Sequence, residues 1–349
     1  MGFRLAVAVL ALAAGWLAGC QSTPTAPSLA SAPASSSTAP TAAPPARQHV
    51  TVAITSPNEM FAIPWVAQDS GILARYGLDA EVVVVGGSPR VTQSLVAGDF
   101  DYAIAATAAL IRARAQGADP QIIAGTSDLA IGQKIMVAPG AAVRSLADLR
   151  GKTVGITQYG SEAHTFIQLA LARAGLDPND ATILQLGASP QVAAAVASGN
   201  VDAGVVSGPA GLRAQRAGGV VLVESRDLHI LSPQGTLATT RRLIERDRDQ
   251  VLRFLSAYVE AIHFFKTNPE ETKRILQQRM GDLPADEVAY LYEEVKDVYQ
   301  PLPTVSAEAI QAVIEREDDI PKTVGPGDVL DMSLLQEIEQ RGLLRQLYP

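Results

Sequence analysis

Cysteine and histidine are scarce in this sequence. Its 349 residues include one cysteine, Cys20, and four histidines. A single cysteine cannot form a disulfide within the chain. The histidines are scattered, with no HExxH pair and no cysteine partner, so we expect no metal site. The GxSxG turn of serine hydrolases is missing as well.

Glycine-rich phosphate loops are also absent. Residues 151–153 (Gly-Lys-Thr) look like the end of a P-loop, but they precede a predicted strand, whereas a phosphate loop follows one. The pair Gly86-Gly87 lacks the GxGxxG spacing. Since no nucleophile, acid–base pair or cofactor motif stands out, we expect no enzyme and no cofactor.

Positive charge is in short supply. The net charge is −8 at pH 7, whereas a protein that binds nucleic acid needs a basic face. We therefore expect no nucleic-acid partner. The charge does not exclude a small anionic ligand, because backbone amides and helix N-termini can bind an anion inside an acidic protein.

The N-terminus has an apolar run over residues 5–18, preceded by Arg4. This run is shorter than the roughly 20 residues that a membrane-spanning helix needs. It ends in Leu17-Ala18-Gly19-Cys20, which resembles the lipobox of bacterial lipoproteins, where the chain is cut before the cysteine and the thiol is lipidated. We predict a signal peptide at residues 1–19 and lipidation of Cys20. An ordinary secretory signal with an incidental cysteine is the alternative.

The next segment is a low-complexity tether. Residues 22–46 are proline, alanine, serine or threonine, except for Leu29. Such a segment buries too little apolar surface to offset its ordering entropy, and its prolines favour a semi-extended chain. We predict that residues 20–48 are disordered and hold the folded part at a membrane surface without crossing the membrane.

The sequence does contain an internal repeat. Four blocks that begin at residues 52, 76, 88 and 98 return in the same order at residues 154, 174, 189 and 199. A repeat of this length is too long for a solenoid unit and fits a half-domain. It predicts two similar α/β lobes that face each other across a ligand cleft.

Each copy of the repeat has a βαβαβ pattern. Strands are expected at residues 50–54, 80–85, 102–105, 153–156, 182–186 and 203–206, and helices at 64–76, 88–97, 161–174 and 189–199. A Ser-Pro pair, Ser88-Pro89 or Ser189-Pro190, is predicted to cap the second helix of each copy. The crossovers imply parallel strands.

The other segments complete an α/β fold. Strands at residues 121–124, 134–137 and 220–223 are candidates for segments that cross between the lobes. After residue 233 only helices are expected, at 243–265, 269–280, 284–298, 306–317 and 332–341, packed back on the first lobe. The predicted lobes are residues 49–128 plus 233–349, and residues 129–232.

Ligands of parallel α/β sheets bind outside the carboxyl ends of the strands. The turns at these ends are small, hydroxyl-rich or glycine-rich, and they open helices. Each helix end favours an anion by about 0.3–1 kcal/mol. The candidate ligand-binding residues in these turns are Ser56, Asn58, Phe61, Ser88, Arg90, Thr107, Tyr159, Gly160, Ser161, His164 and Ser207.

Several candidates also have a purely structural interpretation. Capping alone explains Ser88. Phe61 and Trp65 occupy apolar helix positions, which are more often core than cleft. Arg90 fits a ligand contact, a partner across the cleft or a solvated side chain. His164 fits the cleft or a helix surface.

Two further positions gain meaning from the repeat. A cap before the helix at 161–174 needs Ser161 but not Tyr159, so Tyr159 is predicted to pack on a ligand. Asp101 and Asp202 occupy equivalent positions just before a strand. We interpret both as acceptors for backbone amides rather than as an acid–base pair.

Several stretches resemble a known family. They are residues 67–73, 76–79, 94–101, 145–155 and 268–271. With the lipobox, the tether and the paired lobes, they are similar to the periplasmic solute-binding proteins of ABC importers. The likeness is to the nitrate/sulfonate/taurine-type branch, which has the type II periplasmic binding protein fold. It covers residues 50–280.

The resemblance implies a monomeric receptor, lipid-anchored in the bacterial cell envelope on the periplasmic or extracytoplasmic face. Such a receptor captures a small solute, for example a sulfonate, nitrate or taurine, and delivers it to permease subunits in the membrane. The branch also includes binders of aromatic or heterocyclic solutes such as pyrimidines and riboflavin. The alternatives are a cleft enzyme of the same fold, as in menaquinone or thiamine-precursor synthesis, and a surface sensor that has lost its ligand.

Overall fold

The described chain forms two main sheets, and the first of them contains the N-terminal strand. A computed structural model describes residues 47–349, so the predicted signal peptide, Cys20 and most of the tether lie outside the described residues. The strand order is β2-β1-β3-β12-β4. These strands are β1 (Gln48–Ile54), β2 (Leu78–Val84), β3 (Tyr102–Ala105), β4 (Pro120–Ala124) and β12 (Thr236–Thr240). β1 is parallel to β2 and β3, whereas β12 is antiparallel to β3 and β4.

The second sheet repeats this arrangement. Its order is β10-β6-β9-β7-β8, with β6 (Gln133–Val137), β7 (Thr153–Ile156), β8 (Thr182–Gln185), β9 (Ala203–Ser207) and β10 (Val220–Glu224). β7 is parallel to β8 and β9, and β6 is antiparallel to β9 and β10. The predicted α/β class and the three parallel strands of each copy are confirmed. We call each sheet with its helices the first half and the second half.

The repeat is also visible in two pairs of hydrogen bonds. Asp101 Oδ2 accepts from the amide of Thr51, and Asp202 Oδ2 from that of Thr153, both at 2.9 Å. The predicted structural role of both aspartates is confirmed.

The predicted capping role of the two serines is wrong. Ser88 and Ser189 are the first helical residues, and Gly87 and Ala188 precede them as caps. Ser88 Oγ instead accepts from the amide of Ala106 at 2.9 Å, and Ser189 Oγ from that of Ser207 at 3.3 Å. Each serine therefore ties the start of a helix to the end of the neighbouring strand.

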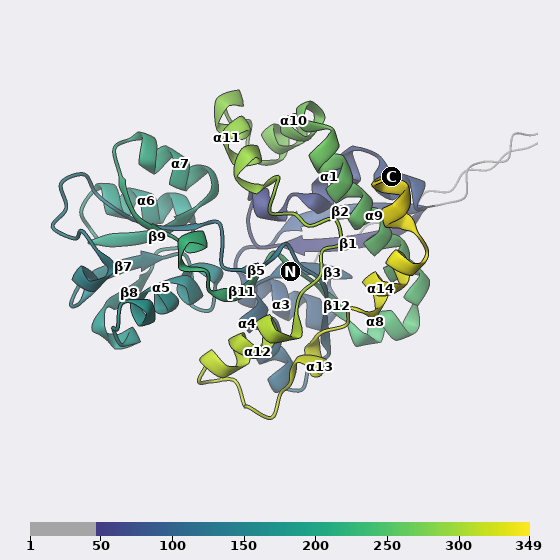
Figure 1. The fold of residues 1–349 in the computed structure, drawn as a ribbon, viewed down its shortest axis with the longest axis horizontal. Helices are drawn as coiled ribbons and strands as arrows, with labels where there is room; N and C mark the ends of the chain where they lie inside the picture. The colour runs from purple at the N-terminus through teal and green to yellow at the C-terminus, as the bar shows by residue number, and fades with distance from the viewer. Residues whose placement is uncertain (1–46) are drawn as a thin grey trace, which may run out of the picture. The chain divides into compact units, whose positions relative to one another are not determined.

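The helices of the repeat cover the sheets, as Figure 1 shows. The first half has α1 (Ile63–Asp69), α2 (Ile72–Arg75), α3 (Ser88–Ala97) and α4 (Thr107–Ala115), and the second half has α5 (Glu162–Arg173), α6 (Ser189–Ala197) and α7 (Gly208–Arg216). The single helix predicted at 64–76 is wrong, because Gly71 has φ +75° and separates α1 from α2. Short 3-10 helices lie at Glu59–Phe61, Leu146–Leu149, Pro178–Asp180 and Ser225–Leu228.

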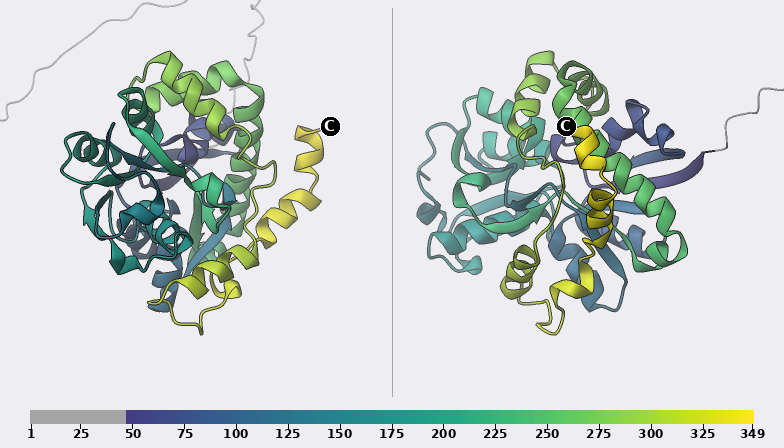
Figure 2. Two further views of the ribbon diagram at one scale, coloured as in Figure 1. Left: turned by 60° about the vertical axis from the view of Figure 1, so that its left-hand side comes forward. Right: turned by 45° about the vertical axis from the view of Figure 1, so that its right-hand side comes forward.

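The C-terminal segment is helical and packs on the first half. It contains α8 (Arg241–Arg246), α9 (Arg248–Thr267), α10 (Pro269–Arg279), α11 (Ala285–Val295), α12 (Ala307–Arg316), α13 (Pro326–Val329), α14 (Ser333–Gln340) and α15 (Leu343–Leu347). Figure 2 shows α14 running beside α9. Phe254 on α9 stacks on Tyr102 of β3 with ring centroids 3.7 Å apart, so α9 shares the core of the first sheet. The predicted helix at 243–265 is divided at Asp247, which caps α9 through the amide of Gln250.

Two predictions about the strands are wrong. β12 lies after residue 233, where only helices were expected, and it occupies an inner position of the first sheet. The strands predicted at 121–124, 134–137 and 220–223 exist, but each belongs to one sheet instead of crossing between them. The connection is a two-stranded ribbon of β5 (Ser127–Leu129) and β11 (Leu231–Gln234). Figure 1 shows this ribbon between the two sheets.

Within residues 47–349, no helix combines the length and apolar character needed to traverse a bilayer. The same residues contain no group of three or more His, Cys, Asp or Glu side chains arranged to hold a metal ion.

Candidate ligand-binding site

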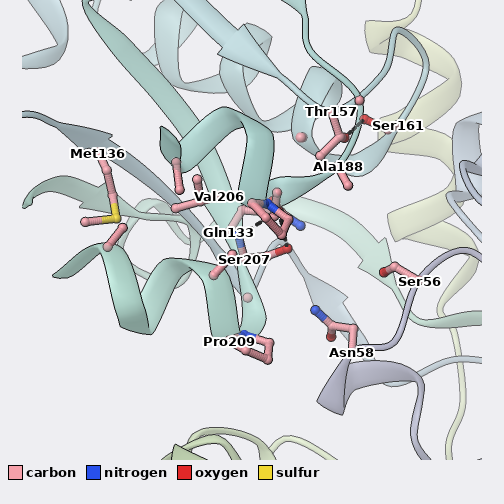
Figure 3. Close-up of a pocket in the computed structure, with 18 of the residues that line it drawn as sticks. Ser56, Asn58, Gln133, Met136, Thr157, Ser161, Ala188, Val206, Ser207 and Pro209 are labelled. Atoms are coloured by element: carbon pink, nitrogen blue, oxygen red, sulfur yellow. Dashed lines mark hydrogen bonds between the residues drawn. The ribbon is translucent and has the colours of Figure 1, made fainter. Parts of the chain in front are cut away.

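A cavity of about 990 Å³ lies between the two halves. Its walls include the turns after β1 and β2 in the first half and after β7, β8 and β9 in the second. These turns stand at the carboxyl ends of parallel strands, where ligands of α/β sheets bind. Figure 3 shows Ser56 and Asn58 on one side of this space, facing Ser207 and Pro209 of the second half.

The cavity brings together seven of the eleven candidate residues. They are Ser56, Asn58, Phe61, Ser88, Arg90, Ser161 and Ser207. The other four, Thr107, Tyr159, Gly160 and His164, are not part of its wall. Contact with a solute stays a prediction for all eleven.

The turn after β1 is closed by a hydrogen bond between a side chain and the backbone. Asn58 Oδ1 accepts from the amide of Met60 at 2.8 Å and caps the 3-10 helix Glu59–Phe61. Phe61 lines the cavity but is also buried in the main core of the first half. Trp65 belongs to that core and is not in the cavity wall, which supports the core interpretation of this residue.

Glu59 is a buried carboxylic acid beside this turn. The residue is 2% exposed, and its Oε2 has no hydrogen-bond partner among the described residues. Burial raises the pKa of Glu59 to about 7, helped by the charge of Glu294 and opposed by a backbone hydrogen bond and by Lys134. An acid with this pKa is partly neutral at physiological pH.

Gly208 brings the second half very close to the same turn. It begins α7 with φ +57°. A β-carbon at this position would lie 3.0 Å from Asn58 Nδ2 and 3.2 Å from Glu59 Oε2. Only glycine permits both this backbone conformation and this approach without a shift of the neighbours.

Ser161 caps α5 as predicted and lines the cavity. Its Oγ accepts from the amide of His164 at 3.4 Å and donates to the carbonyl of Gln158 at 2.6 Å. Thr157 Oγ1 lies 3.1 Å away. Since the Ser161 proton is already used, this hydroxyl faces the cavity as an acceptor.

Tyr159 does not reach the cavity. It is 51% exposed, and its hydroxyl donates to the carbonyl of Ile183 on β8 at 2.7 Å. Its ring meets the edge of His164, with centroids 5.2 Å apart. His164 Nδ1 in turn accepts from the amide of Gly160 at 3.2 Å, and burial together with Arg112 lowers the pKa of His164. In this structure the three residues form a local cluster on the second half.

Thr107 has a structural position. It is buried, and its hydroxyl donates to the carbonyl of Pro233 at 3.0 Å and lies 2.8 Å from Thr236 Oγ1. These contacts fix the start of α4 to the end of β11 and the start of β12.

The candidates predicted from the sequence do not include several polar residues of the cavity wall, chiefly Gln133, Glu162, Gln185 and Arg213. Gln133 begins β6, which is antiparallel to β9, so its amino end lies at the carboxyl edge of the parallel strands. Gln133 is therefore not at the carboxyl end of a parallel strand, although it lies at the same edge of the sheet. For Glu162 the signal was its place directly after Ser161, at the start of α5.

Glu162, unlike Glu59, is part of the cavity wall. Burial raises the pKa of Glu162 to about 7, against the lowering effect of a hydrogen bond from the amide of Gly235. Gly235 belongs to the first half, so Glu162 lies where the halves meet.

Ion pairs join the halves along α11. Arg213 Nε donates to Glu287 Oε2 at 3.0 Å. Lys134, which is almost fully buried, lies 3.4 Å from Glu294 Oε1 and donates to Glu224 at 3.0 Å. Arg90 also lines the cavity, but within residues 47–349 it forms no ion pair. Of the two arginines in the described cavity wall, Arg213 is thus paired and Arg90 is not.

Comparison with known proteins shows the family. Residues 58–272 match the family model "NMT1/THI5 like", so the chain belongs to this family. A putative binding protein of Brucella abortus (strain 2308) is 27% identical over 221 residues, which is 60% of this chain and 65% of the relative. The chain thus matches about two thirds of that relative's length. A putative aliphatic sulfonates-binding protein of Escherichia coli (strain K12) is 29% identical over 202 residues, 58% of this chain and 62% of the relative.

The fold is shared with solved binding proteins. The alkanesulfonate-binding protein SsuA from Xanthomonas axonopodis pv. citri, bound to MOPS, superposes with a TM-score of 0.69 at 23% identity. The match covers 83% of this chain and 99% of that one. It confirms the expected periplasmic binding protein fold.

Proposed function

We propose that this protein is the substrate-binding component of an ABC-type importer. It captures a small sulfonate, nitrate, taurine-like or related solute between its halves and delivers it to permease subunits in the membrane. The observation that carries the proposal is the cavity, because strand-end turns from both sheets form its walls. The names of the relatives, which refer to binding proteins and to sulfonates, support the same function.

Closure around the solute provides the test. A bound solute stabilises the closed form only through contacts that the open form lacks. We expect methanesulfonate, taurine or nitrate, whichever binds by calorimetry, to reduce the radius of gyration in small-angle X-ray scattering. Binding with an unchanged radius of gyration would contradict capture between the halves. Mass spectrometry of co-purified molecules identifies the natural solute.

The proposal includes binding without turnover. We expect the solute to be recovered intact after overnight incubation with the protein, as NMR of the mixture would show. A new product in that spectrum would favour the enzyme alternative.

Arg90 is the proposed contact for an anionic solute. Hydrogen bonds to charged groups contribute about 1.5–3 kcal/mol, so Arg90→Gln is expected to weaken binding of the sulfonate by about 10-fold to 100-fold. Isothermal titration calorimetry measures the effect. Arg144→Gln is the matched control, because Arg144 is exposed and not part of the cavity wall. Equal affinities in both variants would remove Arg90 from the site.

Lipid anchoring through Cys20 is a further part of the proposal. Membrane attachment by acyl chains gains about 0.8 kcal/mol for each buried CH₂. We expect the protein to incorporate a clickable palmitate analogue and to sediment with membranes, and Cys20→Ala to lose both properties. Cys20→Ala protein that still sediments with membranes would point to an uncleaved signal segment instead.

A further inference from the structure

The helix α11 is fixed to the first half and faces the second. Its apolar side is buried in the main core of the first half through Val288, Leu291, Tyr292 and Val295. Figure 1 shows α11 beside α7 of the second half, and the two helices are in contact. A helix that is anchored in one half therefore forms a wall against the other.

The side of α11 that meets the second half is acidic. It carries Asp286, Glu287, Tyr290 and Glu294, which we call the acidic face. Positions 286, 290 and 294 are four residues apart, and position 287 is three before 290, so all four lie on one side of the helix. Residues 285–295 contain no lysine, arginine or histidine. No cation of the helix itself neutralises this side.

Two arginines of α7 meet the first turn of the acidic face. Arg213 Nε donates to Glu287 Oε2 at 3.0 Å. Arg216 Nη1 lies 2.8 Å from Asp286 Oδ2 and 3.7 Å from Glu287 Oε1. The two arginines are three residues apart, so one side of α7 presents both cations to both carboxylates.

Two further cations of the second half meet the other end of the acidic face. Lys134 Nζ lies 3.4 Å from Glu294 Oε1 and donates to the hydroxyl of Tyr290 at 3.2 Å. Arg226 Nη2 lies 3.6 Å from Glu294 Oε1. Glu224 pairs with both cations, at 3.0 Å and 3.3 Å. Since Glu224 belongs to the second half, it positions Lys134 and Arg226 independently of α11.

These ion pairs are only partly exposed to water. The side chains of Lys134 and Glu287 are 6% and 8% exposed, and salt screens buried pairs less than surface pairs. Arg213 and Arg216 are 55% and 45% exposed. They keep much of their hydration, which limits the desolvation cost that can cancel the attraction of an ion pair. Complementary charges also fix the orientation in which two surfaces meet.

We propose that the acidic face of α11 draws the second half onto the first and populates the closed form before a solute binds. The ion pairs join the halves whatever the cavity holds, so this inference does not depend on the identity of the solute. The open form stays populated, since a solute enters through it. One consequence rests on the proposed function: the solute completes a closure that the charges have begun.

Reversing one charge of the acidic face tests the proposal on the solute-free protein. Glu287→Arg turns the attraction to Arg213 and Arg216 into repulsion. It is expected to raise the radius of gyration in small-angle X-ray scattering, and the ratio of open to closed form by about tenfold or more. An unchanged radius of gyration would overturn the proposal. Arg216→Glu, on a half-exposed side chain, replaces Glu287→Arg if the latter lowers the melting temperature strongly.

A charge swap and a matched control separate attraction between the halves from damage to one of them. Glu287→Arg combined with Arg213→Glu opposes unlike charges again and is expected to restore a compact protein. Arg150→Glu breaks an ion pair of 2.6 Å with Asp180 inside the second half and should keep the wild-type radius of gyration. A swap as open as Glu287→Arg alone, or an equal opening in Arg150→Glu, would contradict the proposal.

Salt gives a second, independent measurement. Raising the salt concentration from about 0.01 M to about 1 M shortens the screening length from about 30 Å to about 3 Å. The solute-free wild type is expected to expand, because the attraction between the halves weakens, whereas Glu287→Arg should contract, because the repulsion weakens. The same salt dependence in both proteins would show that the acidic face does not control closure.

Solute binding distinguishes this proposal from the proposed function. Methanesulfonate, taurine or nitrate, whichever binds, should reduce the radius of gyration more in Glu287→Arg than in the wild type, because less of the variant is closed at the start. An equal decrease in both would count against the acidic face. If none of the three binds, the proposed function fails for these solutes, and the solute-free scattering still decides about the acidic face.

Discussion

Replacing Gly208 with leucine is expected to weaken solute binding by up to about a hundredfold. Asn58 and Glu59 lie close to the second half because position 208 is a glycine. The β-carbon of a leucine there would point at both side chains. Overpacking of this kind costs about 1–3 kcal/mol, which corresponds to up to about a hundredfold in Kd. This free energy of overpacking destabilises the arrangement in which residue 208 of the second half contacts Asn58 and Glu59 of the first half. Calorimetry with the best-binding solute measures the loss.

Gly175→Leu is the matched control for this variant. Gly175 has φ +72°, close to the φ of Gly208, and belongs to the second half, but a β-carbon there meets nothing within 4 Å. Both variants therefore carry similar backbone strain, and both should lower the melting temperature. A similar loss of affinity in Gly175→Leu would show that strain, rather than the contact between halves, is responsible.

Glu59→Gln is expected to remove part of the pH dependence of stability. Burial raises the pKa of Glu59 to about 7 in the folded protein, whereas the ordinary value is 4.5. The folded state therefore binds more protons between these two values, and the wild type loses stability as the pH rises through this window. From pH 5 to pH 8 the wild type should lose about 2–3 kcal/mol more than Glu59→Gln.

Urea unfolding at several pH values between 5 and 8 measures this difference. Glu308→Gln serves as the control, because Glu308 is exposed on α12 and the variant should follow the wild type. Glu162→Gln should act in the same direction as Glu59→Gln, because burial also raises the pKa of Glu162. If the free energy of unfolding depends on pH in the same way for Glu59→Gln and the wild type, burial does not raise the pKa of Glu59 in the folded protein.

The repeat made most of the fold predictable from the sequence. Asp101 and Asp202 could be assigned a structural role because they occupy equivalent positions, and the structure gives them the same bond to a strand amide. β12 was not predictable in the same way. Its sequence, Thr-Leu-Ala-Thr-Thr, contains one large apolar residue, and it is a strand because it fits between β3 and β4. Tertiary pairing here outweighs local preference.

The candidate site was predictable to the extent that it follows strand ends. Ser56 and Ser207 lie in the cavity wall because they occupy such ends. Tyr159 is near a strand end as well, but its hydroxyl is bonded to the carbonyl of Ile183, and sequence does not reveal the direction of a side chain. Gln133 enters the wall from an antiparallel strand, whose direction depends on pairing that is not local.

The strand order has a consequence for synthesis of the chain on the ribosome. The second sheet uses only residues 133–224, whereas the first sheet requires β12, which follows all of them. Until Thr236–Thr240 leaves the ribosome, β4 lacks its sheet neighbour, and α9, which supplies much of the first core, has not yet been made. The later-encoded half can thus complete its hydrogen-bonded sheet first, which reverses the usual N-to-C order of domain folding.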